Sequence, residues 1–183
     1  MTKFYTRSGD DGFTGLLGGD RVPKYHPRPD TVGVIDEATA ALGVARAHCL
    51  APGTAALLLQ NQRDLYYLMA EVSATSEKAH KFRKITAERV AWLERQIGEV
   101  GEKIEMPNEF IVPGDTVAGA FLAQARTVIR RAERQVARLL HNKEIENIQL
   151  LRYLNRLSSL CFVLEILENQ AAGSEKPTLA KVE

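Results

Sequence analysis

Apolar residues recur at helical spacing in five segments of this 183-residue chain. The segments extend over about 31–50, 54–77, 86–100, 116–141 and 145–170, and no alternating run between them makes a convincing strand. Because the connections are short, neighbouring helices are expected to pack antiparallel. The pattern predicts one all-α domain, an up-and-down bundle of five helices around a single core.

Candidate cap residues mark the starts of two of these helices. Asp30 or Thr31 can begin the first helix, and Asp115 or Thr116 can begin the fourth. Each of these side chains carries an oxygen that can accept a hydrogen bond from an unpaired N–H group of a first helical turn. We therefore expect the first helix to start near residue 30 and the fourth near residue 116.

Composition divides the chain into three parts within this single domain. A loop over 1–29 is dense in glycine and proline, which break regular structure. The helical bundle occupies 30–170. A polar tail over 171–183 follows it and is expected to fray, as chain ends with few apolar residues do.

The N-terminal loop has the composition of a backbone anion site. Glycines allow successive N–H groups to converge on phosphate oxygens, and hydroxyl or cationic side chains can join them; the candidates are Thr6, Arg7, Ser8, Arg21 and Lys24. The loop is not a Walker motif, because no Gly-Lys-Ser/Thr follows at the required spacing. On composition alone, a phosphate cradle and a flexible leader are equally supported.

Charge and cysteine usage exclude several classes of protein. Against 23 acidic residues stand 24 Lys and Arg, so no overall field attracts nucleic acid or anionic lipid. Cys49 and Cys161 lie in apolar helical patterns and indicate small core residues in a reducing compartment. The N-terminal residues contain no signal-peptide pattern, and no segment has the ~20 apolar residues of a membrane span. We predict a cytoplasmic protein without nucleic-acid or membrane partners.

The fourth helix carries three charged residues on one line. Arg126, Arg130 and Glu133 are separated by four and then three positions, so Glu133 can hold Arg130 while both arginines point at one anion. This line runs beside the arc expected to face the core, which is formed by Phe121, Ala125, Val128, Ala132, Val136 and Leu139. A solvated face with an ordinary ion pair explains the same spacing.

Asn155 interrupts an otherwise leucine-rich surface on the fifth helix. A buried amide without a partner costs about 1–3 kcal/mol, so Asn155 is expected to meet either a neighbouring helix or a ligand. The pattern does not decide between these two partners.

Five ordered blocks of the sequence resemble the PduO-type ATP:cob(I)alamin adenosyltransferases. They span nearly the whole chain, and the block on the fourth helix is the most specific. The blocks are YTRSGDDG at 5–12 with GGDRVPK at 18–24, VIDE at 34–37, FIVPG at 110–114, ARTVIRRAER at 125–134 and NRLS at 155–158.

The resemblance implies a ferritin-like five-helix bundle assembled as a homotrimer, with ATP and Mg²⁺ bound between subunits. The N-terminal loop of one subunit would surround the nucleotide, through Thr6, Arg7, Ser8, Gly9, Asp10, Gly12 and Lys24. Arg130, Glu133 and Asn155 would contribute from the neighbouring subunit, and Asp36 would pair with Arg126 across the interface. The loop is then a nucleotide-binding loop and not a leader.

The implied reaction is attack of cobalt(I) on the 5′ carbon of ATP, with triphosphate as the leaving group. Positioning and stabilisation of the growing charge are then the main tasks, which suit Arg130 and Glu133. No general base is needed, because the nucleophile carries no proton. By the same resemblance, Phe110 would exclude an axial ligand from the corrinoid; without it, Phe110 serves equally well as a loop anchor in the core.

Three positions depart from the family pattern: Thr39 replaces an asparagine, Asp115 a glycine and Ser159 an aspartate. Ser159 would lie at the corrinoid, so its change bears on corrinoid affinity. The alternative function is therefore an ATP- or corrinoid-binding sensor or carrier without turnover. A reductase and an adenosylcobalamin-dependent enzyme are the partners that transferase activity would require.

Overall fold

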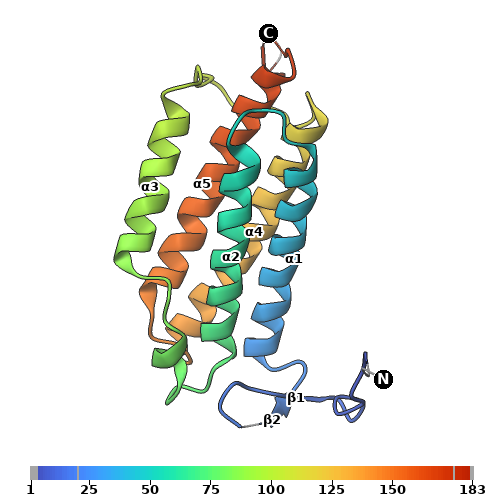
Figure 1. The fold of residues 1–183 in the computed structure, drawn as a ribbon, viewed down its shortest axis with the longest axis vertical. Helices are drawn as coiled ribbons and strands as arrows, with labels where there is room; N and C mark the ends of the chain where they lie inside the picture. Colours follow the sequence, from blue (N-terminus) through green and yellow to red (C-terminus); the bar gives the residue numbers. More distant parts are fainter. Residues whose placement is uncertain (1–3, 20, 175, 182–183) are drawn as a thin grey trace.

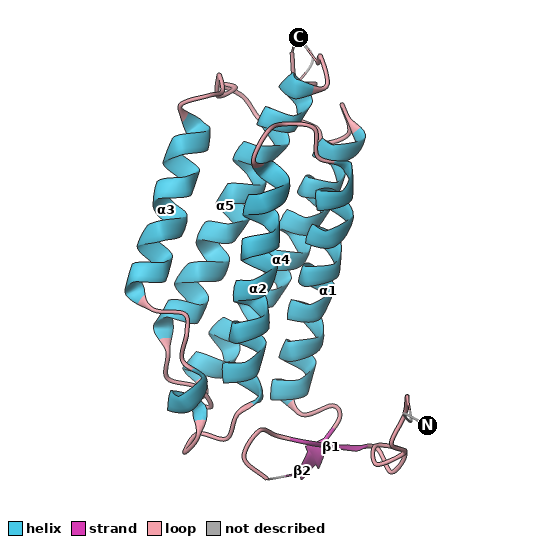
Figure 2. Ribbon diagram, in the orientation of Figure 1, coloured by secondary structure: helices cyan, strands magenta, loops and turns pink. Residues whose placement is uncertain are grey.

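The computed structural model describes residues 4–19, 21–174 and 176–181. The predicted all-α bundle is confirmed: five α-helices run up and down side by side (Figures 1 and 2). They are α1 (Pro27–His48), α2 (Thr54–Ser73), α3 (Ala87–Gly101), α4 (Val117–His141) and α5 (Ile148–Ala171). A short 3₁₀ helix, η1 (Ala79–Phe82), lies in the connection between α2 and α3.

The core lies along α4 and α5. α4 packs against both α5 and α1, α2 packs against α1, and α3 packs against α5. Leucines such as Leu42, Leu65, Leu122 and Leu157 are fully buried at these contacts. Burying one such side chain stabilises the fold by about 1.5–3 kcal/mol relative to leaving it exposed. On α4, Ala125, Ala132, Val136 and Leu139 of the predicted arc are buried, and Phe121 and Val128 pack at its edge.

One of the two predicted helix starts is confirmed. The Thr116 hydroxyl caps α4 by accepting from the Gly119 N–H. The predicted start of the first helix at Asp30 or Thr31 is wrong, because α1 begins at Pro27 with His26 as N-cap. Prolines fit a first helical turn, whose N–H groups have no acceptor within the helix.

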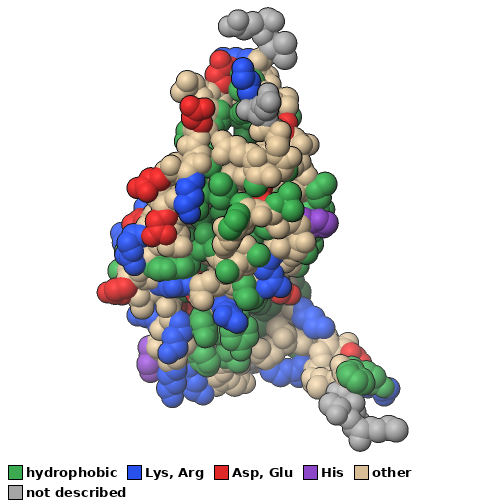
Figure 3. Space-filling model, turned by 45° about the horizontal axis from the view of Figure 1, so that its top comes forward, with side chains coloured by type: hydrophobic (Ala, Val, Ile, Leu, Met, Phe, Trp, Pro, Cys, Tyr) green, Lys and Arg blue, Asp and Glu red, His purple; other side chains and the backbone are tan. Residues whose placement is uncertain are grey.

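The N-terminal segment contains two strands that the sequence pattern does not predict. β1 (Phe13–Gly15) pairs antiparallel with β2 (Arg21–Pro23), with Thr14 opposite Val22. Strands of three residues are too short to show alternation, which explains the error. The segment lies at the end of the bundle where α1 begins (Figure 1), and part of it projects from the body of the molecule (Figure 3). Leu17 ties it to the end of α2, through backbone hydrogen bonds with Ser73 and Thr75.

The C-terminal tail pairs with the loop before α4, where a frayed tail was expected. The Ala180 N–H donates to the Phe110 carbonyl and the Val112 N–H donates to the Thr178 carbonyl, both at 2.8 Å. Asp115 adds side-chain hydrogen bonds to Thr178. The described part of the tail is therefore fastened to this loop. The remaining predicted tail positions, and residues 1–3 and 20 of the predicted N-terminal loop, lie outside the described residues.

Candidate functional site

A cavity of about 630 Å³ lies between α4, α5 and the loop that connects α3 to α4. Its walls are mostly apolar, with a few charged and polar side chains converging on it, as is common in small-molecule sites. The lining residues used below are Phe110 from the loop, Arg126 and Arg130 from α4, and Ser158, Ser159 and Glu165 from α5.

Phe110 lies at the rim of the cavity and is 87% exposed. An anchor in the core would be buried, so the loop-anchor interpretation of Phe110 is wrong. Its backbone carbonyl is held by the tail, while the ring has no core to pack into. The ring is therefore available to contact a flat apolar ligand.

Arg126 and Arg130 line the cavity together, as their four-residue spacing predicts. Arg130 is exposed and forms no ion pair with any described residue. The predicted contact between Arg130 and Glu133 is also missing from the described ion pairs. Glu133 instead accepts a hydrogen bond from Asn155 Nδ2 at 2.8 Å. Arg130 can thus reach an anion without first breaking an internal pair.

Asn155 is satisfied by protein groups at both ends of its amide. Nδ2 donates to Glu133 on α4, and Oδ1 accepts from Arg156 Nη1 at 2.6 Å. Of the two partners expected for Asn155, the structure shows the neighbouring helix. Asn155 therefore joins α4 to α5 just below the cavity, where its side chain can orient Glu133.

Glu165 was missed by the sequence reasoning. It lies on α5 at the cavity wall and is 1% exposed, and its Oε1 atom has no hydrogen-bond partner. The pKa of Glu165 is raised to about 7, mainly because burial disfavours the charged carboxylate. The positive charge of Arg126 lowers this pKa in part, and the negative charge of Asp115 raises it further. Its position inside an apolar stretch of α5 is the same signal that drew attention to Asn155.

The N-terminal residues are drawn together by their own contacts. Thr6 Oγ1 and Ser8 Oγ are 2.7 Å apart, and the Arg21 guanidinium donates to the Ser8 carbonyl and to Asp11. A side chain at Gly9 would lie 3.1 Å from Lys24 Nζ, so this glycine permits the lysine to approach. These contacts bring together hydroxyl groups and cations at one small loop.

Backbone geometry in this loop favours a compact turn. Arg7 and Gly12 both have positive φ angles, 61° and 81°, and the Lys24 N–H donates to the Gly12 carbonyl at 2.9 Å. Asp10 is exposed, with its N–H donating to the Arg7 carbonyl. Both of these N–H groups are therefore paired within the loop, where they hold it in a compact turn.

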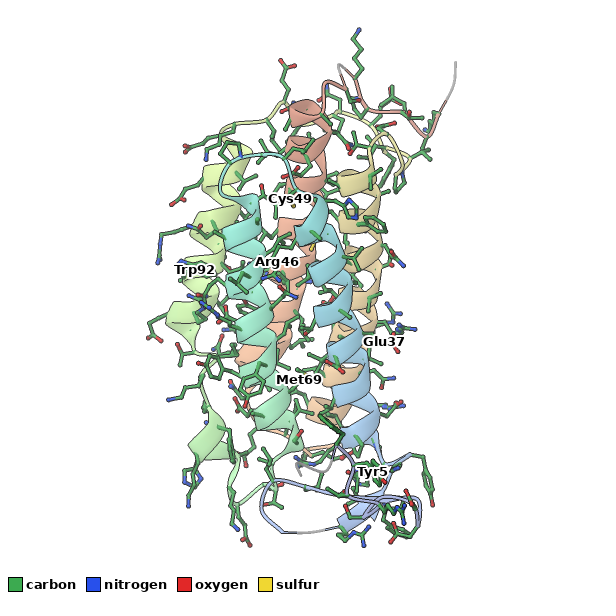
Figure 4. All side chains as sticks on the ribbon, turned by 45° about the vertical axis from the view of Figure 1, so that its right-hand side comes forward. Tyr5, Glu37, Arg46, Cys49, Met69 and Trp92 are labelled. Carbon is green, nitrogen blue, oxygen red and sulfur yellow. The ribbon has the colours of Figure 1, made fainter. Side chains whose placement is uncertain are left out.

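The loop and the cavity lie apart within one chain. Tyr5 lies near the start of α1 (Figure 4), and the loop between α3 and α4, which lines the cavity, lies at the opposite end of the bundle (Figure 1). Among the described residues, no hydrogen bond or ion pair joins positions 4–24 to α4 or α5. Asp36 is exposed on α1 and likewise makes no described ion pair with Arg126.

Of the three residues that depart from the family pattern, two are engaged in hydrogen bonds within the chain and one lines the cavity. Thr39 Oγ1 donates to the Ile35 carbonyl within α1 at 3.0 Å, and Asp115 holds Thr178 of the tail. Ser159 is exposed at the cavity wall. Only Ser159 therefore stands where a cavity ligand would touch it.

Two features are absent from the part of the chain that the structure describes: a cluster of metal ligands and a membrane-spanning helix. Three or more His, Cys, Asp or Glu side chains nowhere gather there in a way that could hold a metal ion. None of the described helices has the length and apolar character needed to cross a membrane.

Comparison with known proteins gives consistent matches along the chain. A family model described as cobalamin adenosyltransferase matches residues 4–168. The corrinoid adenosyltransferase PduO of Salmonella typhimurium is 37% identical over 169 residues, covering 92% of this chain and 50% of that protein. The corrinoid adenosyltransferase of Bacillus subtilis is 37% identical over 175 residues, covering 93% of this chain and 89% of that protein. The chain thus spans about half the length of the Salmonella relative.

The fold is also shared with solved structures. A variant of a PduO-type ATP:corrinoid adenosyltransferase from Lactobacillus reuteri, complexed with cobalamin and ATP, superposes with a TM-score of 0.88 at 27% identity. The match covers 98% of this chain and 97% of that one. Together with the family match over most of its length, this likeness shows that the chain belongs to the cobalamin adenosyltransferase family.

Proposed function

We propose that the protein transfers the 5′-deoxyadenosyl group of ATP to the cobalt of cob(I)alamin or a related corrinoid and releases triphosphate. The observation that carries the proposal is the cavity, which the exposed Phe110 ring lines together with two arginines of α4. The Lactobacillus reuteri relative, which is complexed with cobalamin and ATP, supports the same pair of substrates. The corrinoid would occupy the cavity and ATP would approach from the side of Arg130.

The negative charge that grows on the triphosphate during the reaction explains why an arginine is needed in the site. As the new cobalt–carbon bond forms, the bond between the 5′ carbon and its oxygen breaks and the triphosphate gains negative charge. Fixed cations aimed at such a leaving group can be worth several kcal/mol of transition-state stabilisation. We assign this role to Arg130, with Glu133, held by Asn155, fixing the nucleotide beside it.

The other side of the nucleotide site would come from a second subunit. We propose that Thr6, Arg7, Ser8, Gly9, Asp10, Gly12 and Lys24 close over the phosphates of ATP bound at a neighbouring chain of a homotrimer. The absence of described hydrogen bonds or ion pairs from this loop to α4 and α5 of its own chain supports an arrangement in trans. An ion pair between Asp36 and Arg126 of adjacent subunits would orient the interface.

The remaining requirements follow from the reaction. Mg²⁺ would bind through the ATP phosphates and neutralise part of their charge. The chain would act as one domain with 1–29 as nucleotide-binding loop, and cob(II)alamin would have to be reduced by a separate reductase. We also propose a cytoplasmic location, where the free thiols of Cys49 and Cys161 stay reduced.

Anaerobic spectroscopy tests the proposal directly. The protein is incubated with MgATP and chemically reduced cobalamin, and the corrinoid spectrum is followed against a matched sample without ATP. An ATP-dependent adenosylcobalamin spectrum with release of triphosphate is expected. Tight binding of ATP or corrinoid without transfer would instead identify a sensor or carrier, and binding of neither would reject both functions.

A further inference from the structure

We infer that Glu165, acting with Arg126, is a specificity-determining residue that selects corrinoids bearing a neutral carboxamide over corrinoids bearing a carboxylate at the same rim position. The inference rests on the proposed function, because it takes a corrinoid as the occupant of the cavity. It adds a role for a residue that adenosyl transfer itself does not require.

The first observation is an incomplete hydrogen-bond pattern at the cavity wall. Glu165 is almost fully buried, yet its Oε1 atom has no partner. Buried polar atoms are nearly always paired, since an unpaired one costs about 1–3 kcal/mol. Glu165 lines the cavity, so a ligand there can supply the missing partner once the carboxylate turns from its buried position toward the cavity.

The second observation is a matching donor on the facing helix. Arg126 Nε is buried and also lacks a partner, and Arg126 lines the same cavity as Glu165. The ion pair proposed above between Arg126 and Asp36 of an adjacent subunit would use the Nη groups of the guanidinium and leave Nε for a ligand. No ion pair joins these two side chains in the structure. Two residues of the same mostly apolar wall therefore each keep one buried polar atom without a protein partner, an N–H donor on Arg126 and an oxygen acceptor on Glu165.

A primary carboxamide complements this pair. Its carbonyl oxygen can accept from Arg126 while its NH₂ group donates to Glu165. A carboxylate can also accept from Arg126, but it has no donor for Glu165, which would stay unpaired and, when ionised, would repel it. Corrinoids carry carboxamide side chains around the ring, which makes such a group available at the edge of a corrin bound in the cavity.

The protonation state of Glu165 sets how strongly a carboxylate is rejected. Its pKa is raised to about 7 by burial. The surrounding charges are Arg126 and Arg130 on α4 and Asp115 and Glu109 on the preceding loop, while Cys161 on α5 has its pKa raised to about 12 and stays neutral. Above pH 7 the ionised form dominates and rejection is strongest. Below it, the protonated acid can donate to a carboxylate and rejection weakens.

The experiment compares cobalamin with its separated monocarboxylate isomers, in each of which one rim carboxamide is hydrolysed. Anaerobic titration of the full chain with each corrinoid, with MgATP present, gives the dissociation constants. At pH 8 we expect one isomer to bind about tenfold more weakly than cobalamin, the size of one hydrogen bond to a charged group. At pH 6 this preference should narrow to about threefold or less.

The Glu165→Gln variant removes the charge with little change of shape. The preference of this variant for cobalamin over the monocarboxylate isomer should be small at both pH values. Its KM for ATP should equal that of the unchanged protein. Glu102→Gln is the matched control, because Glu102 is exposed and does not line the cavity. Circular dichroism checks that each variant is folded. Should Glu165→Gln not fold, the inference is still tested by how the preference of the unchanged protein for cobalamin changes between pH 8 and pH 6.

The outcomes separate the two proposals. Adenosyl transfer by a protein that binds every isomer as tightly as cobalamin, or whose preference is the same in Glu165→Gln, would overturn the role of Glu165 and leave the proposed function standing. Failure of the unchanged protein to bind or adenosylate cobalamin would overturn both.

Discussion

Helix α5 buries polar side chains on two sides, and the two sets differ in how complete their hydrogen bonds are. Toward α2, the Tyr153 hydroxyl donates toward Asp64 Oδ2 at 2.6 Å and Asn61 Oδ1 at 2.7 Å. Toward α4, Glu165 and Arg126 each keep a buried atom without a partner. The comparison separates a carboxylate whose hydrogen bonds are completed within the chain from cavity-lining groups that the chain leaves incomplete.

The Asp64 carboxylate shows what a closed network looks like. Gln60 donates to Oδ1, while Oδ2 accepts from Tyr153 and from Arg89 Nε. Arg89 Nη2 lies 2.6 Å from the same oxygen at an angle that makes no hydrogen bond. The Arg89 guanidinium also lies over the ring of Trp92, at 3.5 Å from its centroid, on the outer side of the bundle (Figure 4). No ligand is needed to satisfy this carboxylate.

Removing Arg130, which makes no described ion pair, is the strongest test of the cavity side of α5. Arg130→Ala should lower kcat by about 10²–10³-fold, because a fixed charge facing the leaving group is lost. The helical content by circular dichroism should not change, since Arg130 is exposed and makes no described ion pair. Arg134→Ala, an exposed arginine of the same helix outside the cavity, is the control. Equal losses in both variants would contradict the assignment.

Removing the Tyr153 hydroxyl tests the hydrogen-bond network between α5 and α2. Tyr153→Phe should lower the free energy of unfolding by about 1–3 kcal/mol, because Asp64 and Asn61 lose a buried donor. Urea denaturation at matched protein concentration measures the change. The initial rate of adenosyl transfer by the folded variant should stay the same, since Tyr153 does not line the cavity. An unchanged stability would show that the network is not a structural unit.

The smallest expected effect concerns Glu165 in the protein without ligand. Its pKa is raised from 4.5 to about 7, so ionisation destabilises the folded state. The cost is absent below pH 4.5, grows between the two values and is complete above pH 7. Glu165→Gln should therefore be more stable by about 1–2 kcal/mol at pH 8, discounted for water entering the open cavity.

Thermal denaturation curves of both proteins at pH 5 and pH 8 measure this gain. It should shrink toward zero at the lower pH, where Glu165 is protonated and resembles glutamine. A gain that is the same at both pH values would mean that the charge of Glu165 is not its cause.

Sequence reasoning predicts the helices well because their signal is summed over many turns. The four-residue spacing of Arg126 and Arg130 likewise predicts that they lie together, and both line the cavity; that they bind one anion stays a prediction. The start of α1 was misplaced because prolines were interpreted only as breakers, although a first turn accepts them. Spacing also cannot show that Glu133 reaches Asn155 on α5, since that contact depends on how two helices lie together.

The parts that could not be predicted are held by main-chain contacts or by tertiary burial. The strands β1 and β2 and the pairing of the tail with 110–112 use backbone groups that every residue except proline provides. Glu165 was missed for a different reason. A carboxylate in an apolar stretch can face water, a partner or a cavity, and only the packed structure distinguishes these.

The pairing of residues 110–112 with residues 178–180 has an evolutionary consequence. Because its two hydrogen bonds join amide and carbonyl groups, the side chains at these positions can vary widely while the loop keeps its place. Relatives could therefore exchange the residues around the cavity mouth, and with them the preferred corrinoid, without rebuilding the scaffold. The substitutions this freedom excludes are prolines at Val112 and Ala180, whose N–H groups are the two donors.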